Sequence, residues 1–143
     1  METKTIKKLI KYQSVFLLTV FLSCMNSYNT SESQSFYDFK LKTIDGVEFD
    51  MSSLKGKKIL VVNVASKCGL TPQYKQLEAL YQENKEQNFE VLAFPSSDFA
   101  NQEYSDNEKI SSFCQKNYGV TFTIFEKVSV KGKHKHPFYQ WLT

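Results

Sequence analysis

The sequence has 143 residues and contains no arginine, because all 18 of its basic residues are lysine. Arginine offers a planar fork that holds a carboxylate or phosphate through two parallel hydrogen bonds, whereas lysine is a point charge. Sites that depend on a guanidinium group are therefore excluded.

The main part of the chain also lacks excess charge. The net charge of +3 comes from the first residues alone, Lys4, Lys7, Lys8 and Lys11 against Glu2, and removing these leaves 14 lysines and 14 acidic residues. A nucleic-acid partner would need a basic patch on the folded part, so we expect none.

Hydrophobic runs long enough to cross a membrane are missing as well. The run Val15–Leu22 follows a lysine-rich start and precedes Ser23-Cys24, but it falls short of the roughly 20 residues of a membrane span. This is the layout of a signal peptide. The Phe21–Cys24 segment resembles a bacterial lipobox, which predicts a lipoprotein-type signal peptide over residues 1–23 and lipidation of Cys24. Plain secretion and an uncleaved anchor are the alternatives.

Residues 24–35 are small and polar, as in a flexible tether. The sequence thus predicts an exported protein, held at the membrane by a lipid or periplasmic, with its folded domain over residues 36–143. Any contact with the membrane is expected only through the N-terminal lipid.

Cysteine is scarce, and no two cysteines form a Cys-x-x-Cys pair. With Cys24 assigned to targeting, Cys68 and Cys114 remain for the domain. Two such cysteines outside the cytosol can form a structural disulfide or a redox pair.

Cys68 lies between two contrasting segments. The run Ile59–Ala65 before it is apolar at both alternating positions, which predicts a strand buried on both faces. Thr71 and Pro72 after it are predicted to be the N-cap and first residue of a helix. A helix N-terminus favours a thiolate, so Cys68 is predicted to be reactive rather than a buried structural thiol.

The remaining pattern predicts an α/β domain. A β-hairpin is expected from Tyr37–Lys42 and Val47–Asp50, joined at Asp45-Gly46, because the flanking residues alternate. Further expected elements are a helix from Pro72 to about Glu86, a buried strand Phe89–Pro95, a helix from about Asp106 to Asn117 capped by Ser105 or Asp106, strands at Val120–Phe125 and Val128–Val130, and a short helix Pro137–Leu142.

Two features of these elements bear on the site. Tyr74, Leu77, Leu80 and Tyr81 form an apolar stripe on the first helix, predicted to be core. A strand-helix-strand order predicts parallel strands, and ligands bind beyond their carboxyl ends. Cys68 and the loop Ser96–Glu103 are both expected at that edge.

Three segments of the chain resemble the glutathione peroxidase family: Asn63–Thr71, Phe94-Pro95 with Gln102-Glu103, and Phe113–Phe122. The similarity runs from about residue 36 to residue 142. It implies a thioredoxin-like fold, in agreement with the element order above, and the reduction of hydrogen peroxide or organic hydroperoxides. No cofactor is implied.

The resemblance also assigns roles. Cys68 matches the peroxidatic cysteine, Gln102 the catalytic glutamine, and Cys114 the resolving cysteine of members that use two cysteines. The helix pattern alone predicts a buried structural role for Cys114. A thioredoxin-like dithiol is expected as reductant rather than glutathione, because the two carboxylates of glutathione suit arginine better than lysine.

The chain differs from the family in two places that bear on these expectations. The family has Cys-Asn-Gln-Phe-Gly where this chain has Ser96–Ala100, and Asp98 there is predicted to bring a negative charge near Cys68 that opposes its thiolate. The family's Trp-Asn pair would fall beyond Thr143, so Trp141 is expected to be a core residue of the short helix. We therefore expect an incomplete C-terminal part and an exposed sheet edge.

Two other functions stay open at this point. The first is a catalytically impaired thioredoxin-fold remnant or binding module. The second is a disulfide oxidoreductase, which the spacing disfavours because Thr71 stands where the second cysteine of Cys-x-x-Cys would be. His134 and His136 are expected to be loop residues rather than metal ligands.

Overall fold

The computed structural model describes residues 33–143. The predicted signal peptide 1–23, the predicted lipidation at Cys24 and most of the predicted tether 24–35 lie outside the described residues.

The centre of the domain is a parallel sheet of strands β3 (Lys58–Val64), β4 (Phe89–Pro95) and β5 (Thr123–Ile124), in the order β3-β4-β5. β3 and β4 pair from Lys58 opposite Phe89 to Val64 opposite Pro95. Helix α2 (Tyr74–Asn84) connects β3 to β4, and α3 (Asn107–Tyr118) connects β4 to β5. The predicted parallel strand-helix-strand order is therefore confirmed.

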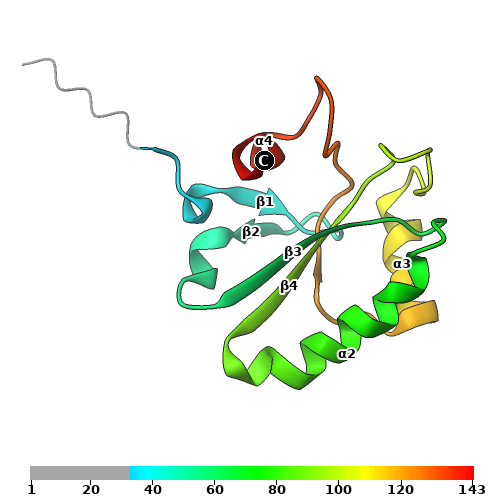
Figure 1. Ribbon diagram of the computed structural model, residues 1–143, viewed down its shortest axis with the longest axis horizontal. Coiled ribbons are helices and arrows are strands. Elements are labelled where there is room, and N and C mark those ends of the chain that lie inside the picture. Colours follow the sequence, from blue (N-terminus) through cyan, green and yellow to red (C-terminus); the bar gives the residue numbers. More distant parts are fainter. Residues whose placement is uncertain (1–32) are drawn as a thin grey trace, which may run out of the picture. The chain divides into compact units, whose positions relative to one another are not determined.

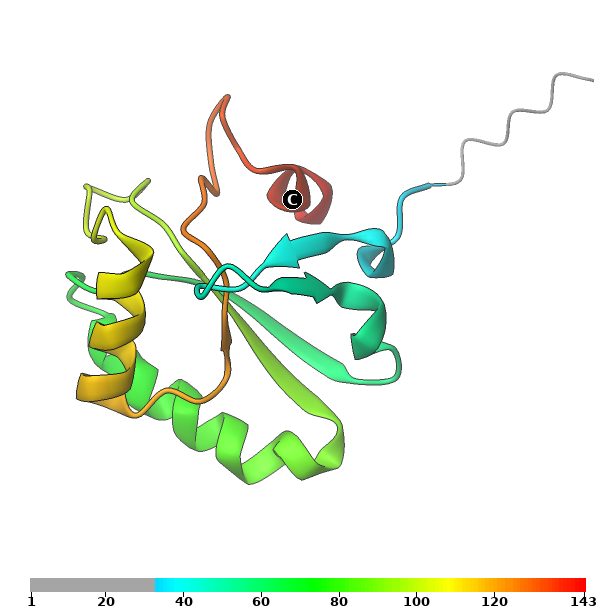
Figure 2. The same cartoon turned by 180° about the vertical axis from the view of Figure 1, so that it is seen from behind.

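Two layers cover the sheet (Figures 1 and 2). Helices α2 and α3 lie on one face, while the antiparallel hairpin of β1 (Lys40–Lys42) and β2 (Glu48–Asp50) lies on the other with α4 (Pro137–Leu142). Side chains of β4 alternate between the two layers. Leu92 and Phe94 pack against the hairpin and α4, and Val91 and Ala93 pack against α2 and α3.

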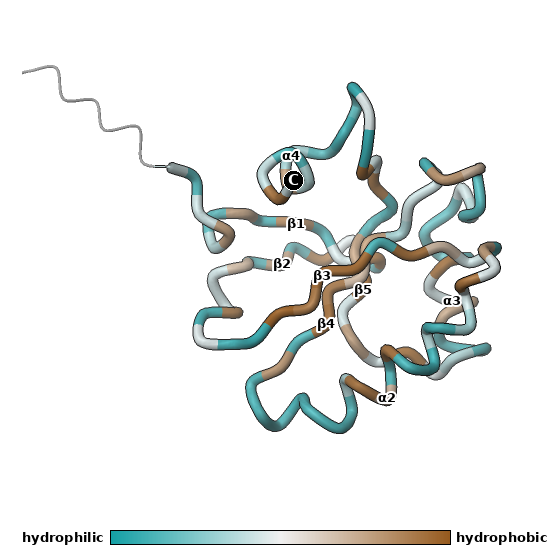
Figure 3. Tube along the Cα trace, viewed as in Figure 1, coloured by the Kyte–Doolittle hydropathy of each residue, from teal (hydrophilic) through white to brown (hydrophobic). Residues whose placement is uncertain are grey.

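Strands β3 and β4 form the apolar centre of the domain, as the colouring in Figure 3 shows. β4 is buried from Glu90 to Pro95, as predicted. The prediction that Ile59–Ala65 is buried on both faces is wrong, because β3 has a neighbour on one side only in the described sheet and its apolar side chains are half-buried. Strand pairing decides which strand lies at the edge of a sheet, and the apolar pattern of β3 does not encode that pairing.

The hairpin is confirmed, but its first strand is shorter than predicted. Phe36–Asp38 form a 3₁₀ turn, because Ser35 and Asp38 close a capping box: Ser35 accepts a hydrogen bond from the Tyr37 N–H, and Asp38 accepts one from the Ser35 N–H. The chain then extends only from Lys40.

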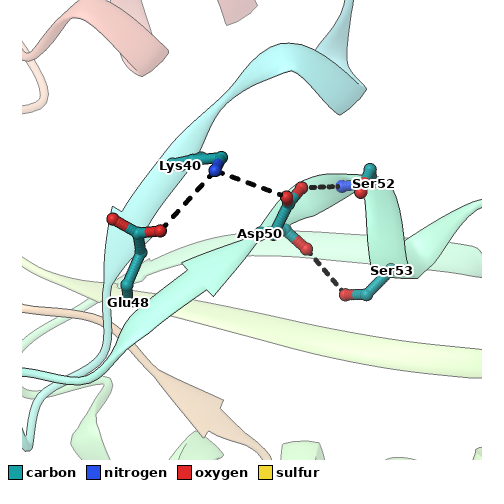
Figure 4. A network of polar contacts seen from close by, with 5 residues as sticks. All are labelled: Lys40, Glu48, Asp50, Ser52 and Ser53. Atoms are coloured by element: carbon teal, nitrogen blue, oxygen red, sulfur yellow. Dashed lines mark hydrogen bonds and ion pairs between the residues drawn. The ribbon is translucent and has the colours of Figure 1, made fainter.

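A polar network fixes the end of the hairpin (Figure 4). The ammonium of Lys40 lies 3.7 Å from the Glu48 carboxylate and 3.9 Å from that of Asp50. Asp50 also accepts hydrogen bonds from the Ser52 N–H (2.8 Å) and, through its carbonyl, from the Ser53 hydroxyl (2.7 Å). Asp50 thereby caps the 3₁₀ turn Met51–Leu54 that leads into β3.

The other predicted helices are found with adjusted ends. The predicted helix from Pro72 to Glu86 is α2 flanked by 3₁₀ turns Thr71–Gln73 and Lys85–Gln87. α3 begins as predicted after Asp106, whose carboxylate accepts a hydrogen bond from the Glu108 N–H at 2.8 Å. α4 covers the predicted residues.

Two predictions for the C-terminal part are wrong. Of the expected strands Val120–Phe125 and Val128–Val130, only Thr123–Ile124 forms. The chain after it divides its hydrogen bonds between two neighbours: the Glu126 N–H donates to the Lys42 carbonyl of the hairpin, and the Val128 N–H donates to the Pro95 carbonyl of β4. Trp141 is 40% exposed rather than core. Its ring meets that of Phe39 edge to face and its Nε1–H donates to the Gln34 carbonyl, so it packs against the segment that precedes β1.

Within residues 33–143, no helix is both long and apolar enough to span a membrane. The same part of the chain contains no cluster of three or more His, Cys, Asp or Glu side chains able to hold a metal ion.

Candidate active site

Cys68 lies on the loop that follows β3. The Thr71 hydroxyl closes this loop, accepting a hydrogen bond from the Cys68 N–H (2.9 Å) and donating one to the Ala65 carbonyl (2.8 Å). The prediction of Thr71 as a helix N-cap is wrong, since Thr71 is itself the first residue of a 3₁₀ turn and bonds backward to the loop. The Leu70 N–H points at the Cys68 sulfur from 3.4 Å.

Gln102 lies on the loop that follows β4. Ala100 and Asn101 just before it have left-handed backbones, with φ of 54° and 52°. This turn brings Gln102 back toward β3, where its carbonyl accepts a hydrogen bond from the Lys67 N–H at 2.8 Å. The loops that carry Cys68 and Gln102 are thus bonded directly to each other.

Cys68 and Gln102 line the same pocket, which has a volume of about 560 Å³. Much of its remaining wall is apolar and includes Leu77, Leu80 and Phe99. Leu80 is 39% exposed, so the prediction that the α2 stripe is entirely core is wrong. Tyr74, Leu77 and Leu80 of that stripe all line the pocket, because β3 is an edge strand in the described sheet and covers this side of α2 incompletely.

Two lysine ammonium groups near the pocket lie against aromatic rings. The Lys67 ammonium lies 4.0 Å from the centre of the Tyr104 ring, and that of Lys131 lies 4.2 Å from the centre of the Phe99 ring. The cation next to Cys68 in sequence is therefore stacked on an aromatic ring.

Asp98 has hydrogen-bond partners that the sequence did not predict. Its carboxylate accepts hydrogen bonds from the Ser129 hydroxyl (2.9 Å) and from the N–H groups of Val130 (2.6 Å) and Lys131 (3.1 Å). Burial opposes the charge, but these hydrogen bonds outweigh it and hold the pKa of Asp98 below its ordinary value. The negative charge thus anchors the 129–131 segment, a role that sequence reasoning missed because the partners lie more than 30 residues away.

Cys114 is fully buried on α3, as the helix pattern predicted, and packs in a cluster with Ile110, Val120 and Tyr74. Burial raises the pKa of its thiol to about 11, and the nearby Glu103 carboxylate adds to the rise. Both Cys68 and Cys114 are free thiols. The structure therefore brings Cys68 and Gln102 together at the pocket and places Cys114 in the core behind it.

Two polar groups near the site, the Tyr74 hydroxyl and the Glu103 carboxylate, received no role from the sequence. Within residues 33–143, the buried Tyr74 hydroxyl has no hydrogen-bond partner and lies beside the Cys114 thiol, and burial together with Cys114 raises the Tyr74 pKa. Glu103 is 5% exposed, although it carries a carboxylate. The only signal for Glu103 was its place beside Gln102 in one of the segments that carried the resemblance.

This arrangement offers a thiol and an amide side chain beside an apolar wall. A thiol is a nucleophile when ionised, and an amide can donate a hydrogen bond to an oxygen or a sulfur. The described residues around the pocket include no ligand set for a metal ion.

Comparison with known proteins agrees with these observations. The profile of the glutathione peroxidase family matches residues 36–143. A glutathione peroxidase of Lactococcus lactis is 53% identical over 108 residues, which are 76% of this chain and 69% of the relative. The glutathione peroxidase-like peroxiredoxin gpx1 of Schizosaccharomyces pombe is 56% identical over 107 residues, 75% of this chain and 68% of the relative.

Among solved structures, that of Trgpx in its apo form superposes with a TM-score of 0.58 at 41% identity, over 78% of this chain. The chain spans 65% of that structure, slightly less than two thirds of its length. The match confirms the predicted thioredoxin-like fold with an N-terminal hairpin. By its sequence and its fold, the chain belongs to the glutathione peroxidase family.

Proposed function

We propose that this protein reduces hydrogen peroxide or organic hydroperoxides, with Cys68 as the peroxidatic cysteine. The observation that carries this proposal is the shared pocket of Cys68 and Gln102, on loops joined by the hydrogen bond from Lys67 to Gln102. Relatives named glutathione peroxidase-like peroxiredoxins, about half identical to this chain, support thiol-based chemistry.

In the first step the Cys68 thiolate attacks one oxygen of the peroxide. A sulfur–oxygen bond forms, the oxygen–oxygen bond breaks, and the leaving oxygen takes a proton to give an alcohol or water. The product on the protein is a sulfenic acid. The Leu70 N–H, 3.4 Å from the sulfur, is placed to stabilise the thiolate, and the Gln102 amide is assigned the role of donor to the peroxide.

In the second step Cys114 resolves the sulfenic acid. Its sulfur attacks that of Cys68, a disulfide forms, and the hydroxyl leaves as water with the thiol proton. A disulfide requires Cα atoms within about 7 Å, and Cys114 is fully buried on α3. This step therefore requires α3 to loosen and release Cys114 from the core.

A thioredoxin-like dithiol then reduces the disulfide and is itself oxidised. The absence of arginine supports this reductant over glutathione.

We also propose that the protein is exported, and that it is either held at the membrane by a lipid on Cys24 or periplasmic. A Cys24→Ser variant that still incorporates labelled fatty acid would contradict the lipid anchor.

Single-turnover oxidation with hydrogen peroxide and an organic hydroperoxide tests the catalytic proposal. One equivalent of peroxide is expected to be consumed, leaving a Cys68–Cys114 disulfide that mass spectrometry detects and thioredoxin reduces. Cys68→Ser should abolish consumption, whereas Cys114→Ser should accumulate the sulfenic acid and stop recycling.

The controls separate the alternatives. A folded wild-type chain that leaves Cys68 reduced in peroxide would favour the remnant or binding module. Recycling by thioredoxin that continues unchanged in Cys114→Ser would refute the resolving role and leave the peroxidatic role intact.

A further inference from the structure

We propose that Glu103 is a positioning residue that holds Gln102 beside Cys68. This inference rests on the proposed function of Cys68 and Gln102 and adds to it a side chain that touches neither the pocket nor the sulfur. It follows from the contacts between the two loops.

Glu103 joins the loops with both carboxylate oxygens. Oε2 accepts a hydrogen bond from the Ser66 N–H at 3.1 Å, and Oε1 accepts one from the Tyr104 N–H at 2.7 Å. Ser66 lies two residues before Cys68, and Tyr104 lies two residues after Gln102. The carboxylate therefore spans from the loop of the thiol to the loop of the amide.

The neighbouring contacts run in the same direction. The Lys67 N–H donates to the Gln102 carbonyl at 2.8 Å, and the Lys67 ammonium stacks on the Tyr104 ring. Residues 66–67 and 102–104 thus form a clasp, in which Glu103 makes the buried side-chain contact.

The chemical type of residue 103 matters for this clasp. Two N–H groups converge on the side chain, and only a carboxylate presents an acceptor to each of them. A glutamine would present one oxygen and one NH₂ group, and the NH₂ would face an N–H donor. Glu103 is 5% exposed and forms no ion pair with any residue in the 33–143 range. A buried carboxylate without a cation is unfavourable compared with an apolar residue, which indicates that its hydrogen bonds serve a specific geometry.

The backbone of the second loop explains why a clasp is needed. Ala100 and Asn101 both adopt left-handed conformations directly before Gln102. Ala is disfavoured there, so the loop does not hold this path by its own preference. Hydrogen bonds hold the path instead: the Asn101 and Gln102 N–H groups bond to carbonyls within the loop, and Glu103, the next residue, bonds across to the loop of Cys68.

A double-mutant cycle tests the inference on the full chain. The variants are Glu103→Gln, Gln102→Ala and the two combined, with Glu90→Gln as the matched control. Glu90 is also a buried carboxylate, but it forms an ion pair with Lys57. It lies at the start of β4, at the opposite end of that strand from the pocket. The readout is the rate constant for oxidation of Cys68 by hydrogen peroxide in a single turnover.

We expect Glu103→Gln to lower this rate constant by roughly 10-fold, because displacing a catalytic group from its position slows a reaction by about that factor or more. The double variant should be no slower than Gln102→Ala alone, since Glu103 acts through Gln102. Glu90→Gln should keep the wild-type rate. Losses that multiply in the double variant would overturn the inference, because they would make Glu103 independent of Gln102.

Amide hydrogen exchange provides a readout that does not depend on peroxide chemistry. Hydrogen exchange of the Ser66 and Lys67 amides should be faster in Glu103→Gln than in the wild type. In Glu90→Gln it should be unchanged. Unchanged exchange in Glu103→Gln refutes the clasp, even in a chain that fails to react with peroxide and so disproves the proposed function. If Glu103→Gln does not fold, Glu103→Asp provides the same comparison with a shortened carboxylate.

Discussion

Protection of Cys114 in the reduced protein is the most direct consequence of the structure for the proposed cycle. Cys114 is fully buried, and burial raises the pKa of its thiol to about 11. The thiolate is the species that alkylating reagents attack. Cys114 should therefore react far more slowly than Cys68, which is half-buried at the pocket.

The pKa alone sets a magnitude. A thiol with a pKa of about 11 is ionised in about one molecule in 10,000 at pH 7, whereas an ordinary cysteine with a pKa near 8.5 is about 3% ionised. Alkylation of Cys114 should thus be about 300-fold slower than that of an ordinary exposed cysteine. Burial adds to this factor, because the reagent must wait for α3 to open.

Iodoacetamide labelling followed by peptide mass spectrometry measures both cysteines in one sample. The Cys114 rate should rise about tenfold per pH unit between pH 7 and pH 10, since the thiolate fraction rises by that factor below the pKa. In concentrated urea the two cysteines should label at similar rates, which is the control for intrinsic reactivity. Labelling of Cys114 within about threefold of an exposed cysteine in the folded protein would refute this account of its burial.

Three further predictions concern stability, measured by urea unfolding. Asp98→Ala should lower the free energy of unfolding by about 2 kcal/mol at pH 7, because three donors lose a charged acceptor. The pKa of Asp98 is lowered in the folded state, so the difference in stability between wild type and Asp98→Ala should be complete above about pH 4 and vanish as the pH falls through the lowered pKa. A difference in stability that does not change with pH would contradict this prediction. Ala100→Gly should raise the free energy of unfolding by about 0.5 to 1 kcal/mol, since glycine accepts φ of 54° without a Cβ clash but costs more entropy; a loss of stability would show that the left-handed turn is not strained. Tyr74→Phe should raise the free energy of unfolding by about 1 kcal/mol, because the buried hydroxyl has no hydrogen-bond partner in the described part of the chain. A loss of similar size would mean that the hydroxyl is paired in solution.

The sequence by itself determined the elements whose signals are local. The cap of α3 at Asp106 and the turn of the hairpin depend on neighbouring residues, so their patterns were sufficient. The same holds for the position of Cys68 after a strand and before a helical turn. The family resemblance added Gln102 and Cys114 as candidates, which local patterns alone would have left as a loop residue and a core residue.

Only the tertiary structure decided the contacts between distant segments. β3 proved half-exposed because strand pairing, not composition, sets which strands are central. Asp98 turned to a segment 31 residues or more away, and Glu103 reached Ser66 across 37 residues. No local pattern encodes such partners, because a hydrogen bond depends on where two chain segments meet and not on the spacing between them. The place of Cys68 between a strand and a helical turn is thus predictable from the sequence, while the clasp that we propose for Gln102 is visible only in the folded chain.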